Sequence, residues 1–162
     1  SLHDALPIYC LYSGTVAGAL EGIFAGIPSM AVSMESMADG TLLRETAAFA
    51  ADLVSGYFMK KRYIGILNVN IPKIKPEKVS WENTKVARLG LLRYSNVIAG
   101  KQIKADEMEF IMRGRPLERY EPETDVYWSR KGYITITPLQ WNQTDFENLR
   151  EVGKLTAAFI DA

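Results

Sequence analysis

The turn Ser13-Gly14-Thr15 carries the residues of this sequence that are best suited to chemistry. It directly precedes a stretch of small and apolar residues, Val16 to Gly26, whose spacing predicts a buried helix. Two hydroxyls and several unpaired backbone N–H groups would therefore meet at the positive end of a helix dipole, where a phosphate is favoured. Gly14 would let a phosphate oxygen approach the backbone, because it has no side chain. The same pattern also fits a plain helix cap, in which Ser13 or Thr15 only accepts a backbone hydrogen bond.

Ser13 lacks the surroundings of an acyl-transfer nucleophile. Its neighbours do not form a Gly-x-Ser-x-Gly elbow, and the only histidine of the chain is His3. His3 lies in the segment 1–8, which resembles the translation of a common sequencing-library adapter and which we therefore set aside as non-native. A native N-terminal arm with a turn at Pro7 is the alternative. If this segment is non-native, the protein has no histidine left for a histidine-dependent triad.

Composition narrows the class of protein. The chain has 162 residues, with 19 basic and 19 acidic side chains, so it lacks the basic excess of a nucleic-acid-binding surface. Its apolar stretches are interrupted by acidic residues and fall short of the ~20 residues of a membrane helix. The single cysteine, Cys10, cannot form an internal disulfide. We therefore expect a cytoplasmic globular protein with a small-molecule substrate and with neither nucleic acid nor membrane as partner.

Phosphomonoester hydrolysis through a divalent ion requires clustered carboxylates at a strand end. Glu21, Glu35 and Asp39 are isolated, so each is interpreted as a solvated or capping residue. Four arginines could bind a phosphate, but we favour subunit contacts or exposure to solvent for them. Three aromatic residues could stack on a base, but we favour packing in the core or at an interface for them. These residues are Arg88, Arg93, Arg113 and Arg115, and Tyr120, Tyr127 and Trp128.

Alternating helices and strands must position the turn. After the first helix, Ser29 to Met34 predicts a buried strand, and Asp39 opens a helix that runs to about Lys60. The expected buried face of this helix consists of Leu43, Ala47, Ala50, Val54 and Phe58. Gly65 to Pro72 predicts a second strand. This rhythm is typical of a parallel sheet covered by helices.

The second half of the sequence has a different residue pattern. Thr84 to Tyr94 and Glu107 to Arg113 predict the arms of an antiparallel hairpin, with a charged turn at Ala99 to Gln102. Thr124 is a candidate N-cap for a short helix that ends at Gly132. Further on, Tyr133 to Thr137 alternates as a strand that Pro138 terminates, and Asp145 to Phe159 predicts a closing helix.

Five motifs together resemble the SurE survival-protein nucleotidases. They occur in the family's order and at roughly its spacing, between Tyr9 and about Val152, and five ordered motifs are far more specific than one. The motifs are YSGTVAGALEGIFAGIPSMAVS (Tyr12 to Ser33), LNVNIP (Leu67 to Pro72), ARLGLLRY (Ala87 to Tyr94), Thr124-Asp125 and GYITITPL (Gly132 to Leu139).

The resemblance implies an α/β fold, an incomplete doubly wound (Rossmann-like) sheet with an extended β-hairpin and a C-terminal strand-helix oligomerisation element. Residues 9–72 would form the C-terminal half of the α/β nucleotidase domain, and residues 73–162 the hairpin and C-terminal oligomerisation region of the same domain. These elements would exchange between the subunits of a homodimer or tetramer. The implied activity is that of a 5'-nucleotidase, which hydrolyses nucleoside monophosphates with a divalent metal cation, magnesium or manganese.

The resemblance also assigns residues. Ser13, Gly14 and Thr15 would line the active site on the phosphate side, and Glu21 would have a structural role. Leu91 stands where the family often has arginine, so that strand receives no substrate role. The family's metal ligands, two adjacent aspartates, a serine and an asparagine, would all precede Tyr9. We therefore expect no catalytic residue and no complete metal site in this chain, which by itself would be inactive.

Two other readings stay open. The chain could be a non-catalytic oligomerisation or binding module, or an unrelated α/β phosphate-binding protein. An Asp-Asp-Gly strand end upstream would favour the phosphatase, and a different N-terminal nucleotide loop would favour the unrelated protein.

Overall fold

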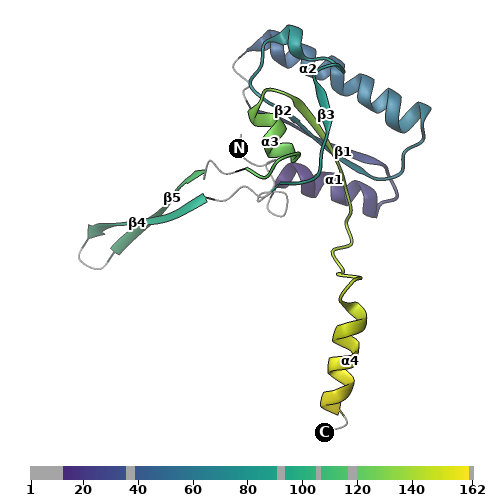
Figure 1. The fold of residues 1–162 in the computed structure, drawn as a ribbon. Helices are drawn as coiled ribbons and strands as arrows, with labels where there is room; N and C mark the ends of the chain where they lie inside the picture. Colours follow the sequence, from purple (N-terminus) through teal and green to yellow (C-terminus); the bar gives the residue numbers. More distant parts are fainter. Residues whose placement is uncertain (1–12, 36–38, 91–93, 105–106, 117–119, 161–162) are drawn as a thin grey trace.

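The computed structural model describes residues 13–35, 39–90, 94–104, 107–116 and 120–160. A sheet with helices on both faces forms the body, and a two-stranded hairpin and a C-terminal helix project from it (Figure 1). None of the helices in these ranges has the length and apolar character needed to cross a membrane. In chain order the elements are α1 (Gly14–Phe24), β1 (Ser29–Met34), α2 (Gly40–Leu53), the π-helix η2 (Val54–Lys60), β2 (Ile66–Ile71), the 3-10 helix η3 (Pro76–Lys78), β3 (Thr84–Val86), β4 (Tyr94–Lys104), β5 (Glu107–Pro116), α3 (Asp125–Arg130), β6 (Ile134–Leu139) and α4 (Leu149–Ile160).

The central sheet is mixed and has the strand order β1-β2-β6-β3. β1 and β2 are parallel, β6 runs antiparallel to β2, and β3 runs parallel to β6. The predicted strand Ser29 to Met34 coincides with β1, and the predicted strand Gly65 to Pro72 contains β2. The α/β, Rossmann-like fold class is therefore confirmed. Within the described ranges β1 has a neighbouring strand on one side only.

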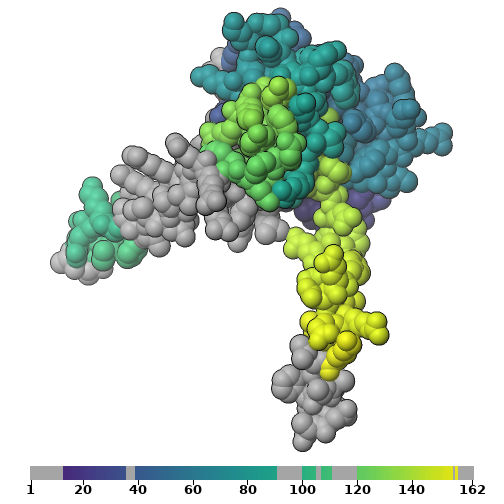
Figure 2. Space-filling model, in the orientation of Figure 1, coloured from purple at the N-terminus to yellow at the C-terminus, as the bar shows by residue number. Residues whose placement is uncertain are grey.

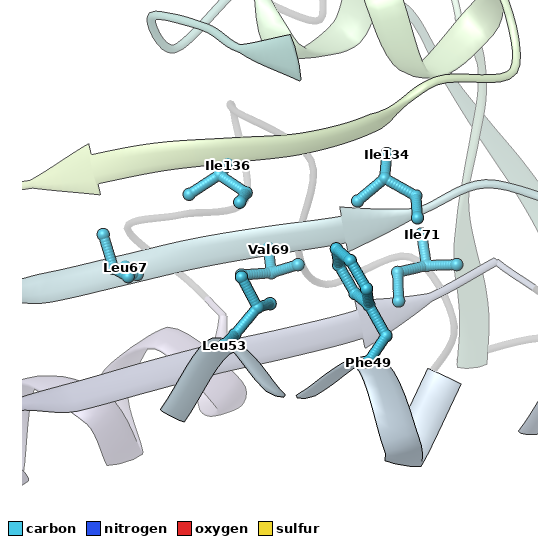
Figure 3. Close-up of a cluster of buried hydrophobic side chains, with 7 residues drawn as sticks. All are labelled: Phe49, Leu53, Leu67, Val69, Ile71, Ile134 and Ile136. Atoms are coloured by element: carbon cyan, nitrogen blue, oxygen red, sulfur yellow. The ribbon is translucent and has the colours of Figure 1, made fainter. Parts of the chain in front are cut away.

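Two apolar cores cover the two faces of the sheet. Helix α2 contributes Phe49 and Leu53 to the larger core, and both side chains point at the strands (Figure 3). This core is built of Phe49, Leu53, Leu67, Val69, Ile71, Ile134 and Ile136. Helix α1 lies on the opposite face in a smaller core of Val16, Ala19, Ala31 and Ile66. Burial of these side chains is the main force that holds the layers together.

The buried face of α2 differs by one residue from the sequence expectation. The side chains that face the sheet are Leu42, Thr46, Phe49 and Leu53, whereas the expected Leu43 and Val54 are exposed. Both sets share the same helical spacing, so periodicity alone could not choose between the adjacent leucines. Phe49 has the largest side chain of this face, and its burial decides which side of α2 faces the sheet. Asp39 is the N-cap, as expected, because its Oδ1 accepts hydrogen bonds from the backbone N–H groups of Thr41 (2.8 Å) and Leu42 (3.2 Å).

The hairpin starts and ends later in the chain than expected. Thr84 to Val86 is not part of an arm but is β3 of the central sheet. The arms are β4 and β5, paired from Tyr94 opposite Pro116 to Lys104 opposite Glu107. The expected turn at Ala99 to Gln102 is wrong, since these residues lie within β4. The β-branched residues on both sides of Gly100 favour an extended backbone, which outweighs the turn tendency of one glycine.

The C-terminal elements α3, β6 and α4 form where the sequence predicts them, but their first or last residues differ from the prediction. Thr124 caps α3 through a hydrogen bond that its Oγ1 accepts from the N–H of Tyr127 at 3.3 Å. Pro138 does not terminate β6, because it lies opposite Leu67 and the strand continues to Leu139. Helix α4 starts four residues late, since Asp145 accepts hydrogen bonds from Asn148 in a turn that precedes the helix.

Candidate phosphate-binding turn

The Ser13-Gly14-Thr15 turn forms the N-terminus of α1. Ser13 is the N-cap, with an extended backbone at φ −78° and ψ 117°. Its Oγ accepts a hydrogen bond from the Val16 N–H at 3.2 Å, and its carbonyl accepts one from the Ala17 N–H at 2.8 Å. The side chain is buried. Ser13 thus acts as a capping residue here, and a direct contact between its hydroxyl and a phosphate stays a prediction.

Gly14 and Thr15 face solvent in the first turn of α1. Among the described residues, a Cβ on Gly14 would meet no atom within 4 Å beyond its chain neighbours and the backbone of its own helix. In the part of the chain that the structure describes, the N–H groups of Gly14 and Thr15 have no hydrogen-bond partner. The first turn contains no acidic side chain, so nothing on the helix offsets the positive end of its dipole. The turn can therefore receive an anion.

The turn lies at the edge of the sheet where β1 and β2 end. A short connection joins α1 to β1, and the helix packs along that strand, so the start of α1 lies beside the end of β1. Open α/β sheets bind their ligands at this carboxyl edge. Glu35 follows β1 at the same edge, where its Oε2 accepts a hydrogen bond from the Lys73 N–H at 2.9 Å. The turn thus has the location of a ligand site.

Among the described residues, carboxylates do not gather at this edge. Glu35 binds a backbone N–H, Asp39 caps α2, and Glu21 is exposed on α1. Among the described residues no group of three or more histidine, cysteine, aspartate or glutamate side chains could hold a metal ion. The donor set of these residues therefore does not fit a divalent metal.

Comparison with known proteins agrees with this architecture. The family model described as survival protein SurE matches residues 4–96, more than half of the chain. The chain belongs to the SurE family. Two relatives carry the name 5'-nucleotidase SurE. The protein from Pelotomaculum thermopropionicum is 35% identical over 147 residues, which cover 90% of this chain and 54% of the relative. The protein from Syntrophomonas wolfei is 33% identical over 153 residues, covering 92% and 56%.

A solved structure shows the same fold. The crystal structure of the SurE protein from Aquifex aeolicus superposes with a TM-score of 0.76 at 27% sequence identity. The match covers 96% of this chain and 63% of the Aquifex chain. This chain therefore spans about half the length of the curated SurE relatives it matches. The interpretation of residues 1–8 as adapter-derived falls outside the described residues and stays a prediction.

The described arginine and aromatic candidates have printed contacts with residues other than those of the turn. Arg88 forms an exposed ion pair with Glu121 at 2.8 Å. The side chains of Arg93, Arg113 and Arg115 lie outside the described residues. The rings of Tyr127 and Tyr133 both pack edge-on against Trp128, and Arg130 lies 5.5 Å from the ring centre of Tyr120. These rings pack against their neighbours, as the sequence interpretation favoured.

Asp125 is a buried carboxylate whose importance sequence reasoning missed. Its Oδ1 accepts hydrogen bonds from the backbone N–H groups of Gly90 (2.7 Å) and Val126 (2.8 Å). Burial raises the pKa of Asp125 from 3.8 to about 6, and these hydrogen bonds oppose the rise. The Thr124-Asp125 motif was recognisable in the sequence as a helix start. Its partner Gly90 was not, because no local pattern connects residues 35 positions apart.

Polar side chains also line the face of the sheet that α1 covers. Asn68 and Asn70 alternate with apolar residues along β2, opposite Thr137 and Thr135 of β6. All four are buried. The motif LNVNIP displays the two asparagines plainly, so a polar stripe on one face of a buried strand was the available signal.

Proposed function

We propose that the full-length protein carrying this chain is a 5'-nucleotidase, a phosphoric monoester hydrolase that releases phosphate from nucleoside monophosphates. Two SurE relatives named 5'-nucleotidase support the reaction class. One observation carries the phosphate assignment, which is the first turn of α1, where no described residue pairs with the N–H groups of Gly14 and Thr15. A phosphate dianion suits this position because its oxygens accept several hydrogen bonds and its charge faces the positive helix end.

Each residue of the turn has a distinct role in this proposal. The Gly14 and Thr15 N–H groups and the Thr15 hydroxyl donate to the oxygens of the phosphoryl group, and this hydrogen bonding stabilises the charge of the transition state. Ser13 holds the turn in shape through its bond from Val16. Gly14 leaves room for the phosphate, since no described residue outside its own helix and chain neighbours lies within 4 Å of its Cβ position.

We assign the metal part of the site to residues other than those that the structure describes. The SurE resemblance places the magnesium or manganese ligands before Tyr9, and the described carboxylates form no group of three or more that could hold a metal ion. The chain alone is then inactive, and the full-length protein loses most of its phosphatase activity on chelation. Turnover that survives chelation, or metal-dependent turnover by residues 9–162 alone, would contradict this assignment.

Helix α2 offers a matched control for the turn. Asp39-Gly40-Thr41 starts α2 in the same way that Ser13-Gly14-Thr15 starts α1, with a capping side chain, a glycine and an exposed threonine. In the full-length protein, Thr15→Val should lower kcat on p-nitrophenyl phosphate by about tenfold or more, because a transition-state donor is lost. Thr41→Val should leave kcat unchanged. Equal activity of the two variants would show that the α1 turn is only a cap.

We further propose that the protein self-associates as a homodimer or tetramer through the hairpin and α4. Helix α4 stands away from the body (Figure 2), and Leu149 and Val152 are each 57% exposed. A helix of 12 residues is marginal in water without tertiary packing. A second copy of the chain supplies that packing in this proposal.

Sizing measurements test self-association. Light scattering of the full-length protein should give a dimer or tetramer, and a variant that ends at Leu139 should be smaller. A non-catalytic module is the rival reading, and it predicts the same association without an Asp-Asp-Gly strand end in the upstream sequence. A full-length protein that is monomeric at all concentrations would contradict both.

A further inference from the structure

The hairpin segment is anchored to the body at two points. The chain leaves the central sheet through Arg88 and Gly90, forms β4 and β5, and returns at Glu121 to Thr124. The two points lie side by side, because Arg88 and Thr124 form an isolated parallel bridge. Whatever holds this bridge together determines where the hairpin begins and ends on the body.

Asp125 contacts the outgoing chain through both its backbone and its side chain. Its N–H donates to the carbonyl of Arg88 at 2.9 Å, and its Oδ1 accepts from the N–H of Gly90 at 2.7 Å. The same Oδ1 accepts from the Val126 N–H at 2.8 Å in the first turn of α3. Asp125 is fully buried. One carboxylate thus joins the outgoing chain to the helix that follows the hairpin.

Thr124 and Gly90 pack against each other at the same point. A Cβ on Gly90 would lie 2.6 Å from both Cβ and Oγ1 of Thr124, which leaves no room for a side chain at position 90. The Thr124 hydroxyl is held in turn, since it donates to the Glu121 carbonyl at 2.7 Å and accepts from the Tyr127 N–H. Packing and hydrogen bonding therefore fix the same pair of chain segments independently.

The exposed ion pair Arg88–Glu121 also joins the two segments, but it is weaker than Asp125. More than half of each side chain is exposed, and ion pairs of this kind contribute little. The Gly90 bond is charge-assisted and buried, and removal of its acceptor leaves a buried N–H unsatisfied. Asp125 therefore contributes more to the anchor than the visible ion pair.

We propose that Asp125 is a positioning residue that locks the root of the β4–β5 hairpin, so that the hairpin meets a second copy of the chain as a preset arm. The association part of this inference rests on the self-association proposed above. The lock itself concerns one molecule and does not depend on association. A preset arm loses less conformational freedom on binding than a loose one, which favours association.

Amide hydrogen exchange at Gly90, in the full-length protein, tests the lock. In the wild type the Gly90 amide should exchange as slowly as the amides of the buried strand β2. Asp125→Ala should accelerate Gly90 exchange by about tenfold or more while the β2 amides stay slow. Asp125→Asn keeps an oxygen acceptor and should stay close to wild type. Glu121→Gln, which removes the exposed ion pair instead, is the matched control and should have no effect.

Sizing of the same variants tests the positioning role. Where the wild type associates, Asp125→Ala should weaken association by about tenfold, whereas Asp125→Asn and Glu121→Gln should not. Unchanged association despite fast Gly90 exchange would overturn the positioning role. Fast Gly90 exchange in the wild type would overturn the lock. This measurement needs no variant, so it tests the lock even if Asp125→Ala fails to fold. A monomeric wild type with a slow Gly90 amide contradicts only the self-association proposal.

Discussion

Asn68 lies directly opposite Thr137 on the antiparallel strands β2 and β6, and both side chains are buried. In the described part of the chain, neither the Asn68 amide nor the Thr137 hydroxyl has a hydrogen-bond partner. The sheet therefore carries polar groups on the face toward α1 that cost free energy to bury. Two threonines make that cost measurable. The Thr124 hydroxyl forms hydrogen bonds, whereas the Thr137 hydroxyl has no partner among the described residues.

Thr137→Val should raise the free energy of unfolding by about 1 kcal/mol, since it removes a buried hydroxyl that has no hydrogen-bond partner among the described residues. Thr124→Val should lower it by about 1–2 kcal/mol, because the Thr124 hydroxyl caps α3 and bonds the Glu121 carbonyl. Urea unfolding of both variants checks the contrast. Equal losses would mean that the two hydroxyls are equally satisfied in the folded protein.

The adjacent leucines of α2 test the orientation of that helix. Leu42 is 2% exposed and Leu43 is 42% exposed. Leu42→Ala should destabilise the protein by about 2–5 kcal/mol, because it leaves a cavity in the core. Leu43→Ala should change the unfolding free energy by less than about 1 kcal/mol. Thermal or urea unfolding distinguishes them, and the reverse order would restore the helix face expected from the sequence.

Asp125 should make the stability depend on pH. Its folded-state pKa of about 6 lies above the ordinary value of 3.8, so the folded protein binds this proton more tightly than the unfolded chain. The resulting stabilisation is complete below the unfolded pKa and is lost as pH rises through about 6. A shift of about two units corresponds to on the order of 2–3 kcal/mol.

The Asp125→Asn variant isolates this effect, because asparagine does not titrate. Between pH 4 and pH 7.5, the unfolding free energy of the wild type should fall by a few kcal/mol relative to that of Asp125→Asn. Other acidic groups titrate in both proteins, so their contributions cancel. Urea titrations at the two pH values give the difference, and parallel pH curves would show that Asp125 has an ordinary pKa.

Two glycines, Gly18 within α1 and Gly26 just after it, should respond to alanine in opposite directions. Gly26, just after the helix, has φ +76°, a left-handed conformation that costs an alanine about 1 kcal/mol. Gly18 lies within the helix, and no described residue outside the helix backbone and its chain neighbours lies within 4 Å of its Cβ position. Gly18→Ala should therefore stabilise the protein by up to about 1 kcal/mol. Melting temperatures that move in the same direction for both variants would contradict this account.

Local chemistry predicted much of the fold. Asp39 and Thr124 were recognisable as helix caps, and the short apolar run Ser29 to Met34 was recognisable as a strand, because each depends on a few neighbouring residues. The choice between Leu42 and Leu43 was not local, since it depends on which side of α2 meets β2. The position of the hairpin was missed for a similar reason. Thr84 to Val86 joins the central sheet because β6, some 50 residues later, is there to pair with it.

The candidate site was predictable only in part. Ser13-Gly14-Thr15 was found because a capping residue, a glycine and a helix start occur together in the sequence. Asp125 could not be found in this way. Its burial and its hydrogen bond to Gly90 depend on two segments that the hairpin separates in the sequence and that meet only in the folded protein. Residues that act through contacts between distant segments leave no periodic signal.

β1 ends the described sheet, and that position affects how the chain behaves in solution. Its outer row of backbone N–H and C=O groups has no strand partner in the described part of the chain, and the strand Ser29–Met34 contains neither a charged residue nor a proline. Natural edge strands normally carry such residues to prevent pairing between molecules. We therefore expect the isolated chain to aggregate through β1 as its concentration rises, and a parallel strand that covers this edge to act as a solubilising element as well as a structural one.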